Sequence, residues 1–306
     1  MVLNDIPTGF RIAAYQHAIY QRHSTNGKRL RMQDALALQA DSHDFIWQAQ
    51  SRALPSTLLT GGSVWASVAD GVSSSPCAAL ASLSFLEVLH HVVEEAALKG
   101  LPETLPQRVR TAVQEWQFRY RNERTEGAST TLASIHIVHD QVCAVNCGDS
   151  RVWRLRRQRS GEIEWLQLSL DHTVWQQILQ EELEPEEAGM EHASIYDGLL
   201  HCLTLGESTD PEPIWDAGLT QHTGASEEWL HVWRGRVAQG DVYLLATDGL
   251  HGTVGDARLS TLWRGEASLD ENISHLKQAY LYAGRLDDCS MIAIEIIGPL
   301  SASCGC

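Results

Sequence analysis

The feature that most constrains the fold is a repeated pattern in which an apolar strand meets an aspartate at its end. VWASVADG ends at Asp70, VCAVNCGDSR contains Asp149, VYLLATDG contains Asp248, and in RLDDCSMIAI the residues Asp287 and Asp288 precede the strand. A carboxylate at the mouth of a buried strand is costly to leave without a partner, so it needs a cation, a hydrogen-bond network or a shifted pKa. Several such carboxylates at one place would repel one another unless a metal ion lay among them.

The chemistry of these side chains favours a hard cation. Carboxylate oxygens suit magnesium or manganese, which retain water molecules and so keep a nucleophile at hand. Any single Asp-Gly pair also fits an ordinary turn, so the pattern gains its meaning from the set. The 14 histidines are dispersed and form no HExxH pair on one helical face, which argues against a histidine-ligated zinc site.

The order of elements predicts the fold class. Apolar runs bounded by turn residues predict strands near 11–20, 34–40, 44–49, 63–69, 129–138, 141–147, 151–157, 163–168, 241–247 and 289–297. Helical patterns cover about 76–98, 105–123 and 269–283, and Pro76 and Pro102 lie near helix starts. Runs of strands separated by runs of helices favour an α+β protein with antiparallel sheets covered by helices over regular βαβ alternation.

The chain reads as one domain with one excursion. Its 306 residues, 43% of them hydrophobic, can bury a sizeable core, and no linker divides them. We expect a single domain over 1–298 and a short tail over 299–306. An excursion at about 174–235 is rich in acid and proline, with EELEPEEAGMEH and ESTDPEPIWDAG. It fits either a solvated surface loop or a flap that gates a substrate site.

Composition excludes several classes of function. A formal net charge of −16 argues against a nucleic-acid partner, because phosphate neutralisation needs clustered Lys and Arg. No charged-then-apolar leader and no run of about 18 apolar residues is present, so we expect a soluble cytoplasmic protein without a membrane partner. The seven cysteines, including Cys304 and Cys306 in the tail, are scattered, and we expect reduced thiols.

Taken together, the short motifs resemble the protein phosphatase 2C family, the metal-dependent PPM-type serine/threonine phosphatases, in their bacterial form. The resemblance covers nearly the whole chain and keeps the family's order of motifs. The matching segments are GKRLRMQDAL at 27–36, SVADG at 67–71, GASTTL at 127–132, CGDSRVWRL at 147–155, LSLDHT at 168–173, LTLGE at 203–207, GDVYLLATDGL at 240–250 and LDDCSMIAI at 286–294.

The resemblance implies a β-sandwich of two antiparallel sheets flanked by helices, in four αββα layers, with a metal centre at its edge. Two Mn²⁺ or Mg²⁺ ions would be bridged by Asp70, and the carbonyl of Gly71 would bind one of them. Asp248 and Asp287 would complete the centre. Asp34 would contribute directly or through a water molecule. Asp149 would lie slightly outside, where many bacterial relatives hold a third, weaker ion.

The resemblance also implies an activity. Arg29 would bind the substrate phosphate, for which a planar guanidinium is well suited, and would form the catalytic set with Asp70 and Asp248. A metal-bound hydroxide would attack phosphorus in line, with no covalent phosphoenzyme. The expected partners are a phosphoserine or phosphothreonine protein as substrate and a serine/threonine kinase that the enzyme opposes.

Some residues depart from the family pattern or carry a simpler interpretation. Val72 and Ser73 stand in DGVSSSP where the family has further glycines and often a histidine or methionine, which leaves the general acid open. We interpret Arg151 as one partner of a structural ion pair and His172 as a structural residue at a strand end.

Two rival functions stay open. One is a weakly active or inactive relative that binds phosphoproteins as a regulatory module, although every expected aspartate is present. The other is a hydrolase of phosphorylated anti-sigma antagonists. Relatives of that kind usually lack the arginine lead-in, so Arg29 favours the ordinary protein phosphatase.

Overall fold

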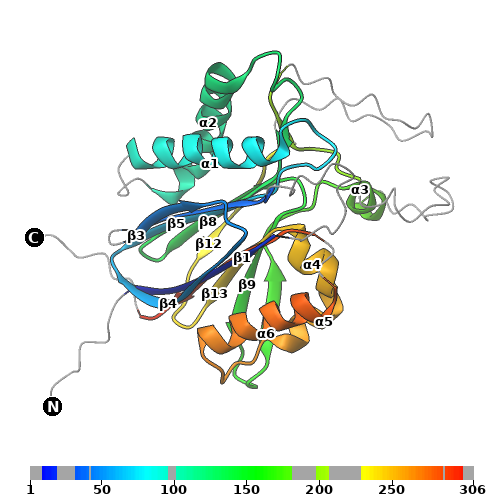
Figure 1. Cartoon of the computed structure of the whole chain (residues 1–306). Coiled ribbons are helices and arrows are strands. Elements are labelled where there is room, and N and C mark those ends of the chain that lie inside the picture. The colour runs from blue at the N-terminus through cyan, green and yellow to red at the C-terminus, as the bar shows by residue number, and fades with distance from the viewer. Residues whose placement is uncertain are drawn as a thin grey trace, which may run out of the picture.

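Two six-stranded antiparallel sheets lie face to face in the computed structural model (Figure 1), which describes residues 9–18, 32–40, 43–95, 101–180, 198–206, 229–284 and 287–298. In spatial order, the first sheet contains β10 (Ile163–Gln167), β9 (Arg151–Arg157), β13 (Val242–Ala246), β14 (Cys289–Ile296), β1 (Gly9–His17) and β4 (Ser51–Thr60). The second contains β12 (His231–Arg236), β8 (Gln141–Cys147), β7 (Leu132–Val138), β5 (Ser63–Ala69), β2 (Ala35–Ala40) and β3 (His43–Trp47). The short strands β6 (Ser129–Thr130) and β11 (Leu203–Thr204) form a separate pair.

Helices cover both outer faces of the sandwich, as Figure 1 shows. The second sheet carries α1 (Ala78–Glu95) and α2 (Leu105–Tyr120), which follows the short 3-10 helix η1 (Pro102–Thr104). The first sheet carries α4 (Asp248–Val254), α5 (Asp256–Leu262) and α6 (Leu269–Tyr282). A further short helix, α3 (Val174–Gln180), begins the acidic excursion. Among the helices that the structure describes, none is long and apolar enough to cross a membrane.

Three apolar clusters hold the layers together. One fills the space between the sheets, where Ile12 and Ile292 of the first sheet face Leu38 and Ile135 of the second. The other two lie between each sheet and its own helices. The predicted four-layer αββα sandwich is therefore confirmed.

The layering explains why the central strands read as continuous apolar runs. All seven residues of β5 and of β7 are buried, because one face of their sheet packs on the other sheet and the opposite face packs on helices. Strict alternation of apolar and polar residues is expected only where one face meets water. The predicted strands near 63–69, 141–147 and 151–157 match the observed ones, and the strand predicted near 129–138 is divided into β6 and β7.

Several elements were not predicted from the sequence. β4 was missed because its sequence contains Pro55 and is largely exposed; as an edge strand that pairs only with β1, it tolerates a proline. β12 and the short helices α3, α4 and α5 were also missed. Most of the excursion, at 181–197 and 207–228, and the tail 299–306 lie outside the described residues, so the flap and the domain boundaries stay predictions.

Candidate metal centre

The acidic residues meet at one edge of the sandwich because antiparallel pairing places the end of one strand beside the start of the next. In the second sheet Ala69 pairs with Ala35, which brings Asp70, after β5, beside Asp34, before β2. In the first sheet Ala246 pairs with Met291, which brings the start of α4 beside the residues that precede β14. β14 contacts both β5 and β2 across the sandwich, so the two acidic pairs share one edge.

The carboxylates of this edge are close enough to perturb one another. Burial raises the pKa of Asp34 well above its ordinary value, and the charge of Asp288 raises it further. Burial likewise raises the pKa of Asp70, and Asp34 and Asp248 add to the effect. These side chains therefore form one cluster of mutually repelling acids in a place from which water is largely excluded.

Asp287 and Asp149, the two outer members of the cluster, also have raised pKa values. Burial, followed by the charge of Asp248, raises the pKa of Asp287 to about 6. Burial, then Asp248 and Asp171, raises the pKa of Asp149 to about 8. Asp149 follows β8 in the turn that leads to β9, so the connection between the two sheets contributes it to the same edge.

Buried carboxylate oxygens without hydrogen-bond donors indicate that the cluster can hold a divalent cation. Among the described residues, Asp34 Oδ1 and Asp248 Oδ1 are buried and accept no hydrogen bond. A buried carboxylate oxygen without a donor is strongly disfavoured, and a cation removes that penalty. No three His, Cys, Asp or Glu side chains in the described part already meet the geometry of a complete metal site. The assignment therefore rests on the mutual perturbation of the acids and on the two unpaired oxygens.

The glycines that follow two of the aspartates are required by close packing. A Cβ atom on Gly71 would collide with the carbonyl oxygen of Ala78, and one on Gly249 would collide with the carbonyl oxygen of Asp288. Gly71 also donates its N–H to the carbonyl of Gln33 at 3.2 Å. The Asp-Gly pattern of the sequence thus reflects backbone segments that approach one another at the acidic edge.

Hydrogen bonds from neighbouring residues hold Asp34 and the backbone of Asp287 in place. Thr247 Oγ1 donates to Asp34 Oδ2 at 2.7 Å and accepts from the N–H of Ser290 at 3.0 Å. The Tyr280 hydroxyl donates to the backbone carbonyl of Asp287 at 2.8 Å. Such contacts fix the orientation of ligating groups in metal sites.

Asp288 is a member of the site that sequence reasoning did not assign. Its Oδ2 accepts the backbone N–H of Gln33 at 2.7 Å, and its charge is the largest influence on Asp34 after burial. The sequence places it beside Asp287 before β14, but spacing alone does not separate the roles of two adjacent aspartates. The structure separates them, because Asp287 acts on Asp70 whereas Asp288 is held against the segment that carries Asp34.

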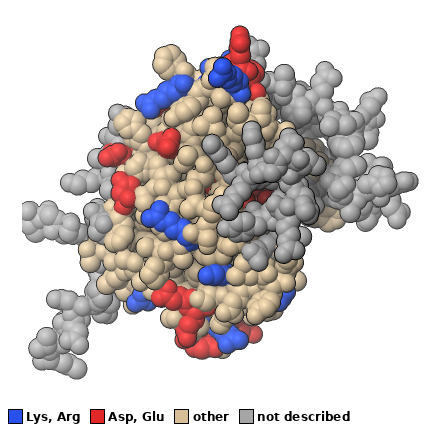
Figure 2. All heavy atoms as spheres, viewed as in Figure 1, with Lys and Arg blue, Asp and Glu red and all other residues tan. Residues whose placement is uncertain are grey.

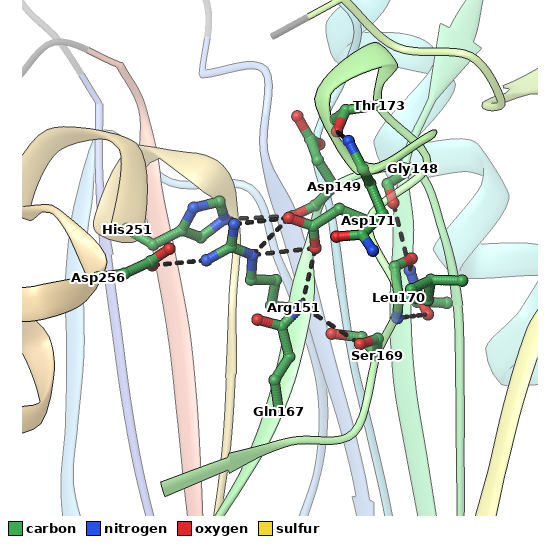
Figure 3. A network of polar contacts seen from close by, with 12 residues as sticks. Gly148, Asp149, Arg151, Gln167, Ser169, Leu170, Asp171, Thr173, His251 and Asp256 are labelled. Carbon is green, nitrogen blue, oxygen red and sulfur yellow. Dashed lines mark hydrogen bonds and ion pairs between the residues drawn. The ribbon is translucent and has the colours of Figure 1, made fainter. Parts of the chain in front are cut away.

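A polar network surrounds Asp149 (Figure 3). Arg151 forms ion pairs with Asp171 and Asp256, as expected of a structural arginine. His172 Nδ1 accepts the N–H of Gly148 at 3.1 Å, which agrees with its structural interpretation, and His251 Nε2 lies 3.2 Å from the carbonyl oxygen of Asp149. Burial lowers the pKa of His172 to about 4 and that of His251 well below its ordinary value, so both imidazoles are neutral at pH 7.

The structure thus brings together the aspartates that the sequence singled out. The charges of Asp34, Asp248 and Asp287 all raise the pKa of Asp70, and Asp248 also raises the pKa of Asp34, Asp149 and Asp287. Gly71 adjoins Asp70. Arg29 lies outside the described residues, so its role as the phosphate-binding residue stays a prediction. On the face drawn in Figure 2, basic and acidic side chains of the described residues are interspersed.

Comparisons with solved structures place this architecture. The serine/threonine phosphatase of S. agalactiae superposes with a TM-score of 0.66 at 16% identity, covering 94% of this chain and 99% of that one. The phosphatase PstP/Ppp of Mycobacterium tuberculosis gives 0.62 at 20% identity, covering 95% and 100%. The catalytic domain of PstP in complex with two manganese ions gives 0.61 at 21% identity, covering 95% and 99%.

The chain therefore has the fold of the bacterial PPM-type serine/threonine phosphatases, and the resemblance stated from the sequence is confirmed for the fold. No family model and no curated protein sequence matches the chain. The fold assignment therefore comes from the structural comparison, and the acidic edge comes from the geometry of this chain.

Proposed function

We propose that this protein is a metal-dependent protein serine/threonine phosphatase that removes phosphate from phosphoserine or phosphothreonine and opposes a serine/threonine kinase. One observation carries the proposal. Aspartates from both sheets meet at one buried edge, where two carboxylate oxygens have no donor among the described residues. This edge belongs to a fold whose solved examples include a phosphatase with two manganese ions.

The residues present fit two Mn²⁺ or Mg²⁺ ions. Asp70, Asp248 and Asp287, with the carbonyl of Gly71, would hold the pair, and Asp34 would contribute directly or through water. Asp149 would hold a third, weaker ion. When bound, the ions would neutralise the acidic edge, withdraw charge from the substrate phosphate and activate a water molecule as the nucleophile.

The chain's own residues would supply binding and orientation. Arg29 would bind two phosphate oxygens through its planar fork and so fix the phosphorus atom over the acidic edge. Thr247 would hold Asp34 in a single orientation, through the hydrogen bond already described. Buried apolar strands behind the cluster exclude water, which strengthens every electrostatic contact at this edge.

The DGVSSSP segment would not supply a general acid. Ser73 Oγ donates to Gln33 Oε1 at 2.6 Å. Ser75 Oγ donates to the carbonyl of Val72 at 2.7 Å and accepts the N–H of Ser129 at 3.0 Å. Both serine hydroxyls are thus committed to hydrogen bonds that hold the loop. Protonation of the leaving group would fall to a water molecule or to another residue.

The rival function is a phosphoprotein-binding module without turnover. Loss of an aspartate from the acidic edge would favour it, whereas the chain retains Asp34, Asp70, Asp149, Asp248 and Asp287, which supports turnover. An opposing serine/threonine kinase and a cytoplasmic location are predictions from the sequence alone.

Hydrolysis of a phosphothreonine peptide and of p-nitrophenyl phosphate by the chelator-stripped protein tests the proposal. Manganese, magnesium or zinc is added back to the parent and to Asp248→Ala. We expect manganese or magnesium to restore turnover in the parent only. A folded parent that binds manganese and phosphopeptide but hydrolyses neither substrate would favour the binding module.

A further inference from the structure

The arginine nearest to Asp149 in the sequence does not pair with it. Arg151 follows two residues later, at the start of β9, and its guanidinium is fully engaged elsewhere (Figure 3). Nε lies 2.9 Å from both carboxylate oxygens of Asp171, and Nη2 lies 2.5 Å from Oδ2 of the same residue. Nη1 lies 2.6 Å from Oδ1 of Asp256.

The two acids that engage Arg151 come from separate elements. Asp171 lies in the segment between β10 and α3, and Gln167 Nε2 donates to its Oδ1 at 3.0 Å. Asp256 is the first residue of α5. The Asp171 side chain is 11% exposed, whereas that of Asp256 is 68% exposed, so Asp171 forms the stronger, less screened arm of the pair.

Hydrogen bonds of the neighbouring backbone hold Asp149, and no described side chain donates to its carboxylate. The Gly148 N–H bonds to His172, the Asp149 carbonyl lies beside His251, and Ser150 Oγ lies 2.7 Å from Thr131 Oγ1. Within the described part of the chain, no side chain donates a hydrogen bond to the Asp149 carboxylate, whose donor is the backbone N–H of Asp149 itself, and Figure 3 draws it without a side-chain donor. These hydrogen bonds hold the turn, and the Asp149 carboxylate is available to a cation.

The charges of Arg151 and Asp171 both act on Asp149, in opposite directions. Arg151 acts on Asp149 in the direction that favours the carboxylate, and Asp171 acts in the opposite direction and more strongly. A guanidinium released from Asp171 would be left with the exposed Asp256 as its only acidic partner. Its flexible side chain would then turn to Asp149, an acid on which its charge already acts, and form a charge-assisted ion pair with it.

We propose that Asp171 and Asp256 hold the Arg151 guanidinium away from the Asp149 carboxylate, and so keep that carboxylate free to bind a divalent cation. The three residues are positioning residues that touch neither substrate nor cation. The inference rests on the proposed role of Asp149 as a ligand of the outer ion. In this arrangement the ion pair with Asp171 prevents the Arg151 guanidinium from competing with the cation for the Asp149 carboxylate.

Manganese binding to the metal-stripped full chain tests the inference without any need for turnover. Free Mn²⁺ is measured by electron paramagnetic resonance during a titration, and Asp149→Asn identifies the class of binding that depends on Asp149. We expect Asp171→Asn to weaken that class on the order of tenfold, because an uncompensated positive charge then lies beside the ligand. The tighter classes should keep their affinity.

The direction in which two further variants change manganese affinity separates competition by Arg151 from simple loss of structure. Asp171→Asn/Arg151→Met removes the competitor and should return the Asp149-dependent class to near the parent affinity. Arg151→Met alone should bind manganese at least as tightly as the parent. If both variants bind as weakly as Asp171→Asn, the pair serves only to hold the loop and the inference is wrong.

Two controls complete the experiment. Asp256→Asn removes the more exposed of the two ion pairs of Arg151 and should fold as the parent does. It should weaken the Asp149-dependent manganese binding by a smaller factor than Asp171→Asn. If Asp171→Asn fails to fold, Asp256→Asn decides the test. Glu164→Gln weakens the Arg154 ion pair on the same strand and should change no class.

The outcomes separate this inference from the proposed function. If Asp149→Asn loses no manganese, Asp149 is not a ligand and the inference fails with that assignment. Phosphatase assays of the parent run alongside. A parent that binds manganese as expected but shows no turnover contradicts the proposed function alone, and unchanged binding in Asp171→Asn contradicts this inference alone.

Discussion

Replacing Asp287 by asparagine should make the metal-free protein less sensitive to pH. Burial and Asp248 raise the pKa of Asp287 from 3.8 to about 6. The native state therefore binds this proton more tightly than the unfolded state. Stability from this group is fully present below pH 3.8 and is lost as pH rises to about 6. A shift of about two units corresponds to about 3 kcal/mol of unfolding free energy, since each unit is worth about 1.4 kcal/mol.

Asparagine is a suitable replacement because it removes the charge and keeps the shape. Its Oδ1 can still accept the N–H of Asp288, which bonds to Asp287 Oδ1 at 2.8 Å in the parent. Urea unfolding of chelator-treated parent and Asp287→Asn between pH 4 and 7 measures the difference. We expect the variant to gain about 2.4 kcal/mol on the parent across that interval, because about 0.6 kcal/mol is already lost at pH 4. A difference that does not vary with pH would refute the reasoning.

Three further predictions concern Asp70, Arg29 and Gly249. Asp70→Ala should abolish turnover in the manganese-supplemented assay yet retain the parent's circular dichroism, because removing one of several repelling carboxylates need not unfold the chain. Arg29→Ala should raise KM for a phosphopeptide far more than it lowers kcat, and a change confined to kcat would contradict its role in binding. Gly249→Ala should destabilise the fold by about 2 kcal/mol or more in urea unfolding, because its Cβ would collide with the carbonyl of Asp288; unfolding at the parent's midpoint would contradict this.

The fold could be predicted where the chain alternates clearly between long elements. α1, α2 and α6 carry helical periodicity over four to five turns, and the central strands are bounded by turn residues, so their order alone indicated an α+β sandwich. β4 escaped because an edge strand exposes polar residues and accepts a proline. α4 escaped because it begins at Asp248 itself, where the Asp-Gly pair reads as a turn.

The acidic edge could be predicted as a set, but not in its inner arrangement. Strand-end aspartates are visible in the sequence, and antiparallel pairing brings them together. The different partners of Asp287 and Asp288 depend on which backbone lies opposite each one, which no spacing encodes. The acidic partners of Arg151 lie 20 and 105 positions away along the chain. The sequence contains many acidic residues and does not show which of them lie near Arg151 in the fold.

The measurement that tests the central claim most directly is anomalous diffraction from crystals of the protein soaked in manganese. The account predicts two strong manganese peaks between Asp70, Asp248 and Asp287, with Asp34 alongside and a weaker peak at Asp149. Strong peaks elsewhere on the surface, with none at this edge, would contradict it.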